Sequence, residues 1–344
     1  MVVTAFSLPG CYLGHLACGQ LRLLSAREPI QRVVAAPETS PLLRGQLALV
    51  EEVREFAAQL GLEVDGNYTS YVPWEGDRVV TTLVAAEPGS VEPREFWFPL
   101  VGRVPYKGYF DQSRAEAEAE KLRAQKLDVC VVAVPAYSTL GWFDDPVTGP
   151  MLRSGEGRLV ETLLHELVHA TVFLPDAVDF NEGVATFIGE EASVRFYAAQ
   201  RSVPAAAAAA RQREVEDGRR YDDALLAFRS QVEALYSEPE THADRAERRA
   251  QAEQEARRGL ASLPLATRDP AALAQAARLN DACLALAATY TADLPDYERV
   301  LAELGGDLGA FVSRLRAAGE SDDPRGFLLG TPSEKATASE TAPD

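Results

Sequence analysis

Two segments decide the fold of this chain: LLHELVHA at 163–170 and FNEGVATF at 180–187. In the first, His165 and His169 are four residues apart, which places them one turn apart on the same face of a helix, close enough to bind one metal ion. Glu166 lies at the edge of that face, where its carboxylate can take a proton from a metal-bound water. The second segment offers a further carboxylate. Together they predict two neighbouring helices around a metal site.

A simpler interpretation competes with the metal site, namely a buried helix whose two histidines are satisfied by ordinary hydrogen bonds. The chain has only four histidines, and the other two, His15 and His242, lie far away in the sequence. Apolar residues surround the motif, so the helix is expected to be buried on most sides, where uncompensated polar groups are costly. A bound metal compensates them directly. We therefore expect Zn²⁺ as the cofactor, in a site of the zinc-peptidase type.

The candidates for the third metal ligand are the acidic residues that follow the motif. Glu182, Glu190 and Glu191 fall on the next predicted helix, and Asp179 falls just before it, where it can cap that helix. Glu182 lies in the first turn, well placed to fold back towards His169. Glu190 shares its side of the helix, whereas Glu191 points to the side opposite Glu182. Glu182 is therefore the preferred ligand and Glu190 the alternative.

Length and charge exclude some classes of protein. At 344 residues the chain can bury a substantial core, and its 52 acidic residues outnumber 34 basic ones, for a net charge of −18. No basic stripe is present to neutralise phosphates, so we expect no nucleic-acid partner. No apolar run is long enough to span a membrane. These properties are typical of a globular enzyme.

The expected fold class is α+β, mainly helical, with a zincin-like metallopeptidase core. Residues 68–135 are expected to contribute a small mixed sheet, and additional helices cover the C-terminal third. We expect residues 1–200 to form the catalytic region and residues 201–320 a helical region packed on it. Residues 321–344 are polar and are expected to be a disordered tail.

Local patterns predict the individual elements. The metal helix should run from about residue 157 to about residue 174, and a second helix from about 180 to about 200. Two apolar runs within 68–86, separated by Glu75–Asp77, indicate a β-hairpin, and an edge strand in the region from Val79 to Ala86 could pair with a substrate backbone. After Pro204, Ala-rich and charged segments predict long helices that form a hairpin broken near Pro239.

The chain also resembles known families. HELVH followed by NEGVAT resembles the gluzincin arrangement of zinc peptidases, and the chain from about Gly10 to about Ala318 resembles a family of bacterial predicted aminopeptidases. This resemblance implies that His165, His169 and Glu182 are the metal ligands and that Glu166 is the general base. The segments that carry it are GQLRLLSAREPI (19–30), FPLVGRVPYKGYF (98–110), AYSTLGWFDDP (136–146), HELVHATVF (165–173), FNEGVATFIGEEA (180–192) and LNDACLALAATY (279–290).

The cysteines bear on location. Leu8–Cys11 reads LPGC and resembles a bacterial lipobox, and members of the resembled family usually begin with a lipoprotein signal that ends in a Gly-Cys pair. We therefore expect membrane attachment through a lipidated Cys11, on the periplasmic side of a bacterial cell envelope, with a cytoplasmic location as the alternative. Cys130 and Cys283 lie in apolar runs and are expected to be small buried residues, without a disulfide framework.

Two further roles are left open by the residues. A hydrolytic zinc site needs a donor that stabilises the oxyanion, and Tyr137 and Tyr109 are candidates for this catalytic role. Aromatic core packing is an equal alternative for both. An aminopeptidase also needs an acid that binds the substrate α-amino group, and four are available: Glu190, Glu191, Asp144 and Asp145.

The function expected from these observations is a zinc-dependent peptidase, and more specifically an aminopeptidase. It would hydrolyse peptide bonds by zinc-activated water with Glu166 as the general base. Its partner is then a peptide substrate. An endopeptidase, another zinc hydrolase, and a zinc-bound, non-catalytic binding or scaffold protein of the cell envelope are the alternatives. The long helices lack a sustained heptad, so the oligomeric state is left open.

Overall fold

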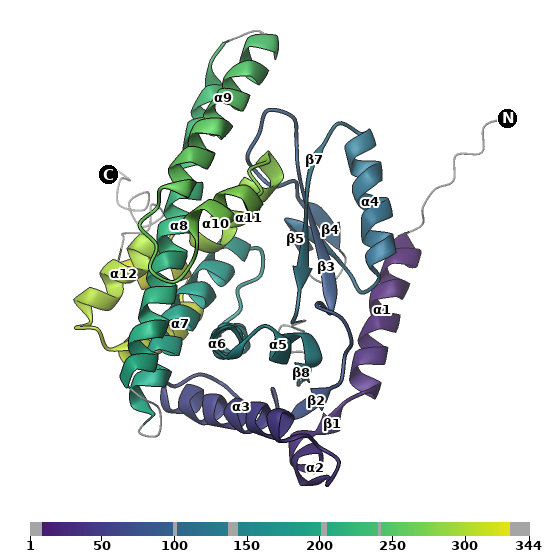
Figure 1. Ribbon diagram of the computed structural model, residues 1–344, viewed down its shortest axis with the longest axis vertical. Coiled ribbons are helices and arrows are strands. Elements are labelled where there is room, and N and C mark those ends of the chain that lie inside the picture. Colours follow the sequence, from purple (N-terminus) through teal and green to yellow (C-terminus); the bar gives the residue numbers. More distant parts are fainter. Residues whose placement is uncertain (1–8, 99–101, 137–143, 201–204, 240–241, 331–344) are drawn as a thin grey trace, which may run out of the picture.

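The computed structural model describes residues 9–98, 102–136, 144–200, 205–239 and 242–330. The protein is mainly helical, with short strands gathered beside the central helices (Figure 1). The helices are α1 (Pro9–Ser25), α2 (Ile30–Ala35), α3 (Pro41–Gln59), α4 (Gln112–Ala124), α5 (Gly149–Arg153), α6 (Glu156–Thr171), α7 (Val178–Ala199), α8 (Ala205–Ser237), α9 (His242–Ala261), α10 (Pro270–Ala276), α11 (Asp281–Thr291), α12 (Leu294–Glu303), α13 (Leu308–Gly319) and α14 (Pro324–Leu329). The strands are β1 (Glu28–Pro29), β2 (Ser70–Val72), β3 (Val80–Ala86), β4 (Phe96–Phe98), β5 (Gly102–Val104), β6 (Tyr106–Tyr109), β7 (Asp128–Val134) and β8 (Val147–Thr148).

The two helices predicted around the motif are α6 and α7, and they form the centre of the molecule. Leucines and valines of α6 are fully buried, and α7 is buried along most of its length. α6 ends at Thr171, three residues earlier than predicted, where the next residue, Val172, adopts an extended conformation. Their largest cluster of buried side chains also includes residues of α3, α12 and α13. The two motif segments therefore lie inside the main hydrophobic core.

In the described part of the chain, three small sheets take the place of the single sheet predicted over 68–135. They have the strand orders β1-β2-β8, β6-β3-β7 and β4-β5. The first is mixed, because β2 pairs antiparallel with β1 and parallel with β8. It also draws β1 and β8 from outside the predicted range. Figure 1 shows β3 and β7 between α4 on one side and α11 on the other.

The hairpin predicted over residues 68–86 is wrong. Its two apolar runs become β2 and β3, which belong to different sheets. β3 is instead the central strand of its sheet and pairs antiparallel with both β6 and β7. It therefore presents no free edge to a substrate. β3 is buried on both faces, and an apolar run of this kind indicates a central strand without identifying its partners.

A disulfide joins Cys130 on β7 to Cys283 on α11. It corrects the expectation that both cysteines are isolated buried residues. The two cysteines are 153 residues apart in the sequence, so their spacing gave no indication that they would pair. The bond fastens α11 to the sheet.

The C-terminal part packs back onto the core. α8 and α9 lie against each other as the predicted helical hairpin, broken between Ser237 and His242. The tail predicted to be disordered from residue 321 contains α14, whose Leu328 and Leu329 are buried in the main core. The prediction of disorder rested on the polar composition of the whole segment, whereas these two leucines provide enough apolar surface for its first part to pack on the core. Residues 331–344 lie outside the described residues.

Among the described helices, none combines the length and the apolar character that a transmembrane span requires.

Candidate metal centre

His165, His169 and Glu182 come together, as the sequence predicts. The Nε2 atoms of the two histidines are 3.1 Å apart. Oε2 of Glu182 lies 3.4 Å from Nε2 of His165 and 3.5 Å from Nε2 of His169. Two imidazole nitrogens and one carboxylate oxygen therefore form a triangle that could hold a metal ion.

Close contact between α6 and α7 makes this triangle possible. Gly189 on α7 lies directly against α6, where an added Cβ would be 3.2 Å from both the Glu161 carbonyl oxygen and the His165 Cβ. That spacing is tighter than an ordinary van der Waals contact, so a side chain at position 189 would push the helices apart. The glycine in IGEEA thus lets Glu182 reach the histidines across the helix interface.

Asn181 fixes the loop between the two helices. Its side chain is almost fully buried and clips the backbone of Leu174 twice, since Nδ2 donates to the carbonyl oxygen at 2.7 Å and Oδ1 accepts from the N–H at 3.0 Å. This clip holds the start of α7 against the end of α6. In the Asn-Glu pair, Asn181 therefore orients the backbone from which Glu182 projects.

The electrostatics of the triangle favour charge on Glu182. Burial opposes ionisation of this carboxylate, yet the neighbouring His169 and His165 rings outweigh burial and lower the pKa of Glu182 below its ordinary value. For His169, burial lowers the pKa and the Glu182 carboxylate raises it, with a net pKa above the ordinary value. An anionic carboxylate beside two imidazoles is a suitable ligand set for a divalent cation.

Glu166 borders the triangle on α6. Its Oε2 atom is buried, and no group in the described part of the chain donates a hydrogen bond to it. A buried carboxylate oxygen without a partner is costly and calls for an explanation. A role as a proton acceptor in a reaction would explain why this oxygen is left without a partner.

Two tyrosines face this centre that the sequence did not single out. The ring of Tyr290 on α11 stacks on the ring of His165 with centroids 6.4 Å apart, which places it beside Glu182. The charge on Glu182 and burial raise the pKa of Tyr290 well above 10, so its hydroxyl stays protonated. Tyr290 is the last residue of LNDACLALAATY, one of the segments that resemble the aminopeptidase family. That resemblance was the only feature of the sequence that pointed to this tyrosine.

Tyr68 is the second. Its side chain is almost fully buried, and burial, followed by the nearby Glu166 carboxylate, raises its pKa. The backbone of Tyr68 has φ of 58°, a left-handed conformation that is rare for a bulky residue. The Tyr68 N–H donates to the Asp145 carbonyl oxygen at 2.7 Å and helps to hold this conformation. No pattern in the sequence signals it, because the contact is entirely tertiary.

The tyrosines proposed from the sequence do not take this position. Tyr109 lies on β6 in the cluster beneath α4, with its ring against Tyr12 at 5.2 Å between centroids. Among the described interactions none joins Tyr109 to the metal triangle, so core packing describes its role. Tyr137 lies outside the described residues.

The remaining acids have other partners. Glu190 and Glu191 both form ion pairs with Arg219, at 2.8 and 3.0 Å. Glu190, the alternative third ligand, is therefore already engaged with a cation. Asp145 is buried at 3% exposure and anchors the Tyr68 loop through its backbone. Asp144 is exposed, and its carbonyl oxygen accepts from Arg27 at 2.8 Å. Only Glu182 therefore joins the histidines.

Comparison with known proteins gives one match. No curated protein and no solved structure matches this chain. One family model, described as "Putative aminopeptidase", matches residues 11–325. That span covers most of the chain and includes the metal triangle, Glu166 and Tyr290, and the chain therefore belongs to this aminopeptidase family.

Proposed function

We propose that this protein is a zinc-dependent aminopeptidase with Glu166 as its general base. The observation that carries the proposal is a three-donor triangle beside a buried carboxylate oxygen that has no partner among the described residues. A structural metal site would need only the triangle. The additional unpaired oxygen is what a hydrolytic site requires.

Zinc fits the donor set best. It is bound in proteins by imidazole nitrogens and carboxylate oxygens at about 2.0–2.2 Å, and a tetrahedral arrangement with such bonds has ligand atoms about 3.3–3.6 Å apart. The three separations here are 3.1, 3.4 and 3.5 Å. Three protein ligands also leave a fourth position open, as catalytic zinc sites do. When bound, zinc would act as a Lewis acid and make water nucleophilic near neutral pH.

The protein side chains would then handle the protons. Glu166 Oε2 would take a proton from the attacking water and deliver it to the nitrogen of the leaving amine. Tyr290 would donate from its hydroxyl to the oxyanion that forms on the substrate carbonyl. Its raised pKa supports this role, because the phenol keeps its proton across the working pH range. In this proposal Tyr290 takes the role that the sequence suggested for Tyr137 or Tyr109.

The location proposed is the bacterial cell envelope, with a lipid on Cys11. The LPGC sequence at Leu8–Cys11 supports it, and so does the Cys130–Cys283 disulfide, because disulfides persist in oxidising compartments such as the periplasm. A cytoplasmic protein would be expected to keep both thiols reduced. Labelling cells with a radioactive or clickable fatty acid, with Cys11→Ser as the control, tests the attachment.

The decisive test of the activity uses peptides with free and with acetylated N-termini. The zinc-loaded protein should cleave the free peptides one residue at a time, and Glu166→Gln should lower kcat by about 10²–10⁴-fold while zinc content stays unchanged. Equal cleavage of acetylated peptides would contradict an aminopeptidase and favour an endopeptidase. If Glu166→Gln left every cellular phenotype intact while His165→Ala abolished it, the zinc-bound scaffold would be the better description.

A further inference from the structure

The helix α1 turns an apolar side away from the protein. Exposed residues recur at helical spacing along this side, which is called the outer face of α1 and consists of Leu13, Gly14, Ala17, Cys18 and Leu21. Leu21 keeps 66% of its surface exposed, and a Cβ added at Gly14 would meet no described atom within 4 Å. Figure 1 shows α1 at the edge of the molecule, with the sheet and α4 on its other side.

Polar side chains of α1 point the opposite way, into the protein, beside the buried Leu23. The Tyr12 hydroxyl donates to the Gly108 carbonyl oxygen at 3.0 Å, and Nε2 of His15 accepts from the Phe110 N–H at 3.1 Å. These bonds cover part of the open edge of β6, an outer strand of its sheet. A surface helix usually turns its polar side to water and its apolar side to the core, so α1 is largely reversed.

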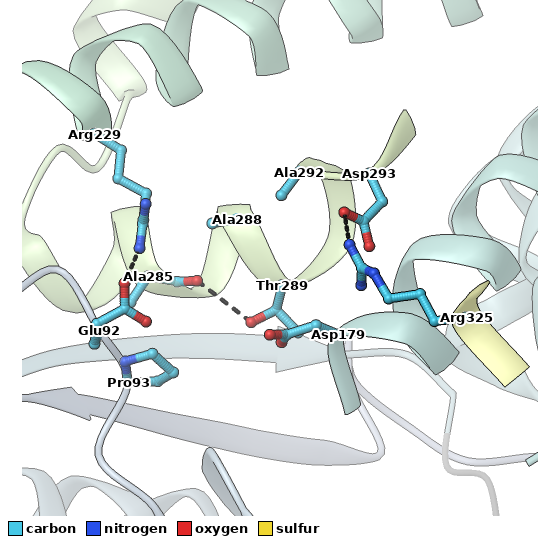
Figure 2. Close-up of a pocket in the computed structure, with 10 residues that line it drawn as sticks. All are labelled: Glu92, Pro93, Asp179, Arg229, Ala285, Ala288, Thr289, Ala292, Asp293 and Arg325. Carbon is cyan, nitrogen blue, oxygen red and sulfur yellow. Dashed lines mark hydrogen bonds and ion pairs between the residues drawn. The ribbon is translucent and has the colours of Figure 1, made fainter. Parts of the chain in front are cut away.

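Gln20 shows that this orientation is costly. Both polar atoms of its side-chain amide are buried, and no group in the described part of the chain bonds to either of them. In contrast, charged side chains at a cavity of about 170 Å³ keep a partner each, since Glu92 pairs with Arg229 and Asp293 with Arg325 (Figure 2). Rotating α1 about its axis would expose the amide and bury the leucines. The observed orientation is therefore favourable only if the outer face also meets an apolar surface.

The charge of α1 indicates what kind of surface that is. The chain has 52 acidic residues among its 344, yet none of them lies in α1, whose charged residue is Arg22. The surface of a bilayer that contains anionic lipids repels carboxylates and attracts arginine. An apolar face without carboxylates, next to an arginine, therefore suits a lipid surface.

We propose that the outer face of α1 lies on the surface of a lipid bilayer. Cys11, where the lipid is proposed to be attached, is in the first turn of the same helix, and Leu13 follows it by two residues. An acyl chain at this position would hold α1 at the bilayer, and a small apolar face binds well once it is held close to its partner. This inference extends the proposed location and does not depend on peptidase activity.

The test attaches the full-length Cys11→Ser protein to vesicles by a histidine tag placed before Met1, so that no lipid on the protein is needed. The vesicles contain phosphatidylethanolamine, phosphatidylglycerol and a small share of nickel-chelating lipid. Cys18 is free and exposed, whereas Cys130 and Cys283 form the disulfide, so a polarity-sensitive dye can be coupled to Cys18 alone. On the vesicles the dye emission should shift to shorter wavelength, and nitroxide groups on the lipid acyl chains should quench it.

The matched control carries the same dye on α3. In Cys11→Ser/Cys18→Ser/Leu42→Cys the dye replaces a leucine that is 72% exposed and lies outside the outer face of α1. Its emission should be the same on vesicles and in solution. Equal quenching at positions 18 and 42 would overturn the inference, because the tether alone would then bring any surface to the lipid. An unchanged emission from Cys18 on vesicles would overturn it as well.

Substitution of the leucines separates the contribution of the helix from that of the dye. Leu13→Ser/Leu21→Ser should lower the ratio of lipid-shielded to solvent-exposed dye at Cys18 at least about tenfold, because the burial of two leucine side chains is lost. Leu42→Ser should leave this ratio unchanged. A ratio that survives the loss of both α1 leucines would show that the dye itself causes the contact.

A second copy of the chain is the competing occupant of the outer face. Sedimentation of the untethered Cys11→Ser protein should give the same mass with and without Leu13→Ser/Leu21→Ser. A dimer that these substitutions dissociate would overturn the membrane assignment in favour of a dimer through α1. Because the tether replaces the acyl chain, lipid contact by α1 in a protein whose Cys11 takes up no fatty acid in cells would contradict the proposed lipidation and leave this surface standing.

Discussion

The ring of Tyr290 on α11 stacks on the ring of His165 on α6, with centroids 6.4 Å apart. This contact brings the C-terminal helices into a centre whose three candidate metal ligands and Glu166 all come from α6 and α7. The surroundings of the metal triangle therefore include a part of the chain that lies far from the motif in the sequence. α11 is fastened to the sheet by the Cys130–Cys283 disulfide, so the position of Tyr290 depends on that connection as well.

Replacing Tyr290 tests its role directly. Tyr290→Phe should lower kcat by about 10²–10³-fold, because one donor to the oxyanion is lost, while zinc content and the fold are retained. Steady-state kinetics with zinc analysis of the same samples measures both. Tyr109→Phe is the matched control, since its ring lies in the apolar cluster beneath α4, and it should leave kcat unchanged. Similar losses in the two variants would show that Tyr290 acts only through packing.

Metal binding should depend on the triangle and not on the neighbouring acid. His169→Ala and Glu182→Gln should each weaken zinc binding by more than about 100-fold, because loss of a ligand exceeds the 10–100-fold effect of its supporting residues. Glu190→Gln should keep close to one zinc per chain, since its carboxylate binds Arg219 at 2.8 Å. Competition with a chelator gives the affinities. Less than about half an equivalent in the reconstituted wild type would refute the site.

The disulfide should stabilise the fold appreciably. It closes a loop of 153 residues, and its removal in the double variant Cys130→Ser/Cys283→Ser should lower the free energy of unfolding by about 2–5 kcal/mol. Urea denaturation with and without a reducing agent measures this difference. The reductant should have no effect on the double variant. Cys18 is a free, exposed thiol, so Cys18→Ser should behave as the wild type in both conditions.

The raised pKa of Glu190 predicts that the free energy of unfolding depends on pH. Burial raises the pKa of Glu190 to about 7, from 4.5, although Arg219 opposes the shift. The folded state therefore holds this proton where the unfolded state has lost it. The resulting stabilisation is fully present below pH 4.5, is lost as the pH rises through about 7, and amounts to about 3 kcal/mol.

Glu190→Gln should flatten that decline between pH 5 and pH 7.5, as measured by denaturation at each pH. Glu191→Gln removes another carboxylate from Arg219 and serves as the control for loss of an ion pair. A decline of the same slope in the wild type and in Glu190→Gln would show that other groups cause it.

The helices around the motif illustrate what could be predicted from the sequence. The predicted helices at 157–174 and 180–200 correspond to α6 and α7, and His165, His169 and Glu182 meet as expected. Each of these predictions rests on spacing within one helix, or on a short loop between two consecutive helices. Local geometry of this kind is fixed by the backbone period and needs no knowledge of distant segments.

The strands show where the same reasoning fails. The two apolar runs in residues 68–86 correctly indicated two strands, but the prediction paired these strands with each other, whereas β2 and β3 belong to separate sheets. An apolar run tells that a strand is buried, and it carries no information about which strand lies alongside. The pairing of Cys130 with Cys283 was missed for the same reason.

By itself, the sequence determined that His165 and His169 share one face of a helix with Glu166 beside them, and that helix predominates, because these follow from residue types at fixed spacing. Only the tertiary structure decided that Tyr290 rather than Tyr109 faces Glu182, that Tyr68 adopts a left-handed conformation near Glu166, and that Asp179 opens into a cavity. These contacts join segments far apart in the chain, and their partners are chosen by the packing of the whole core.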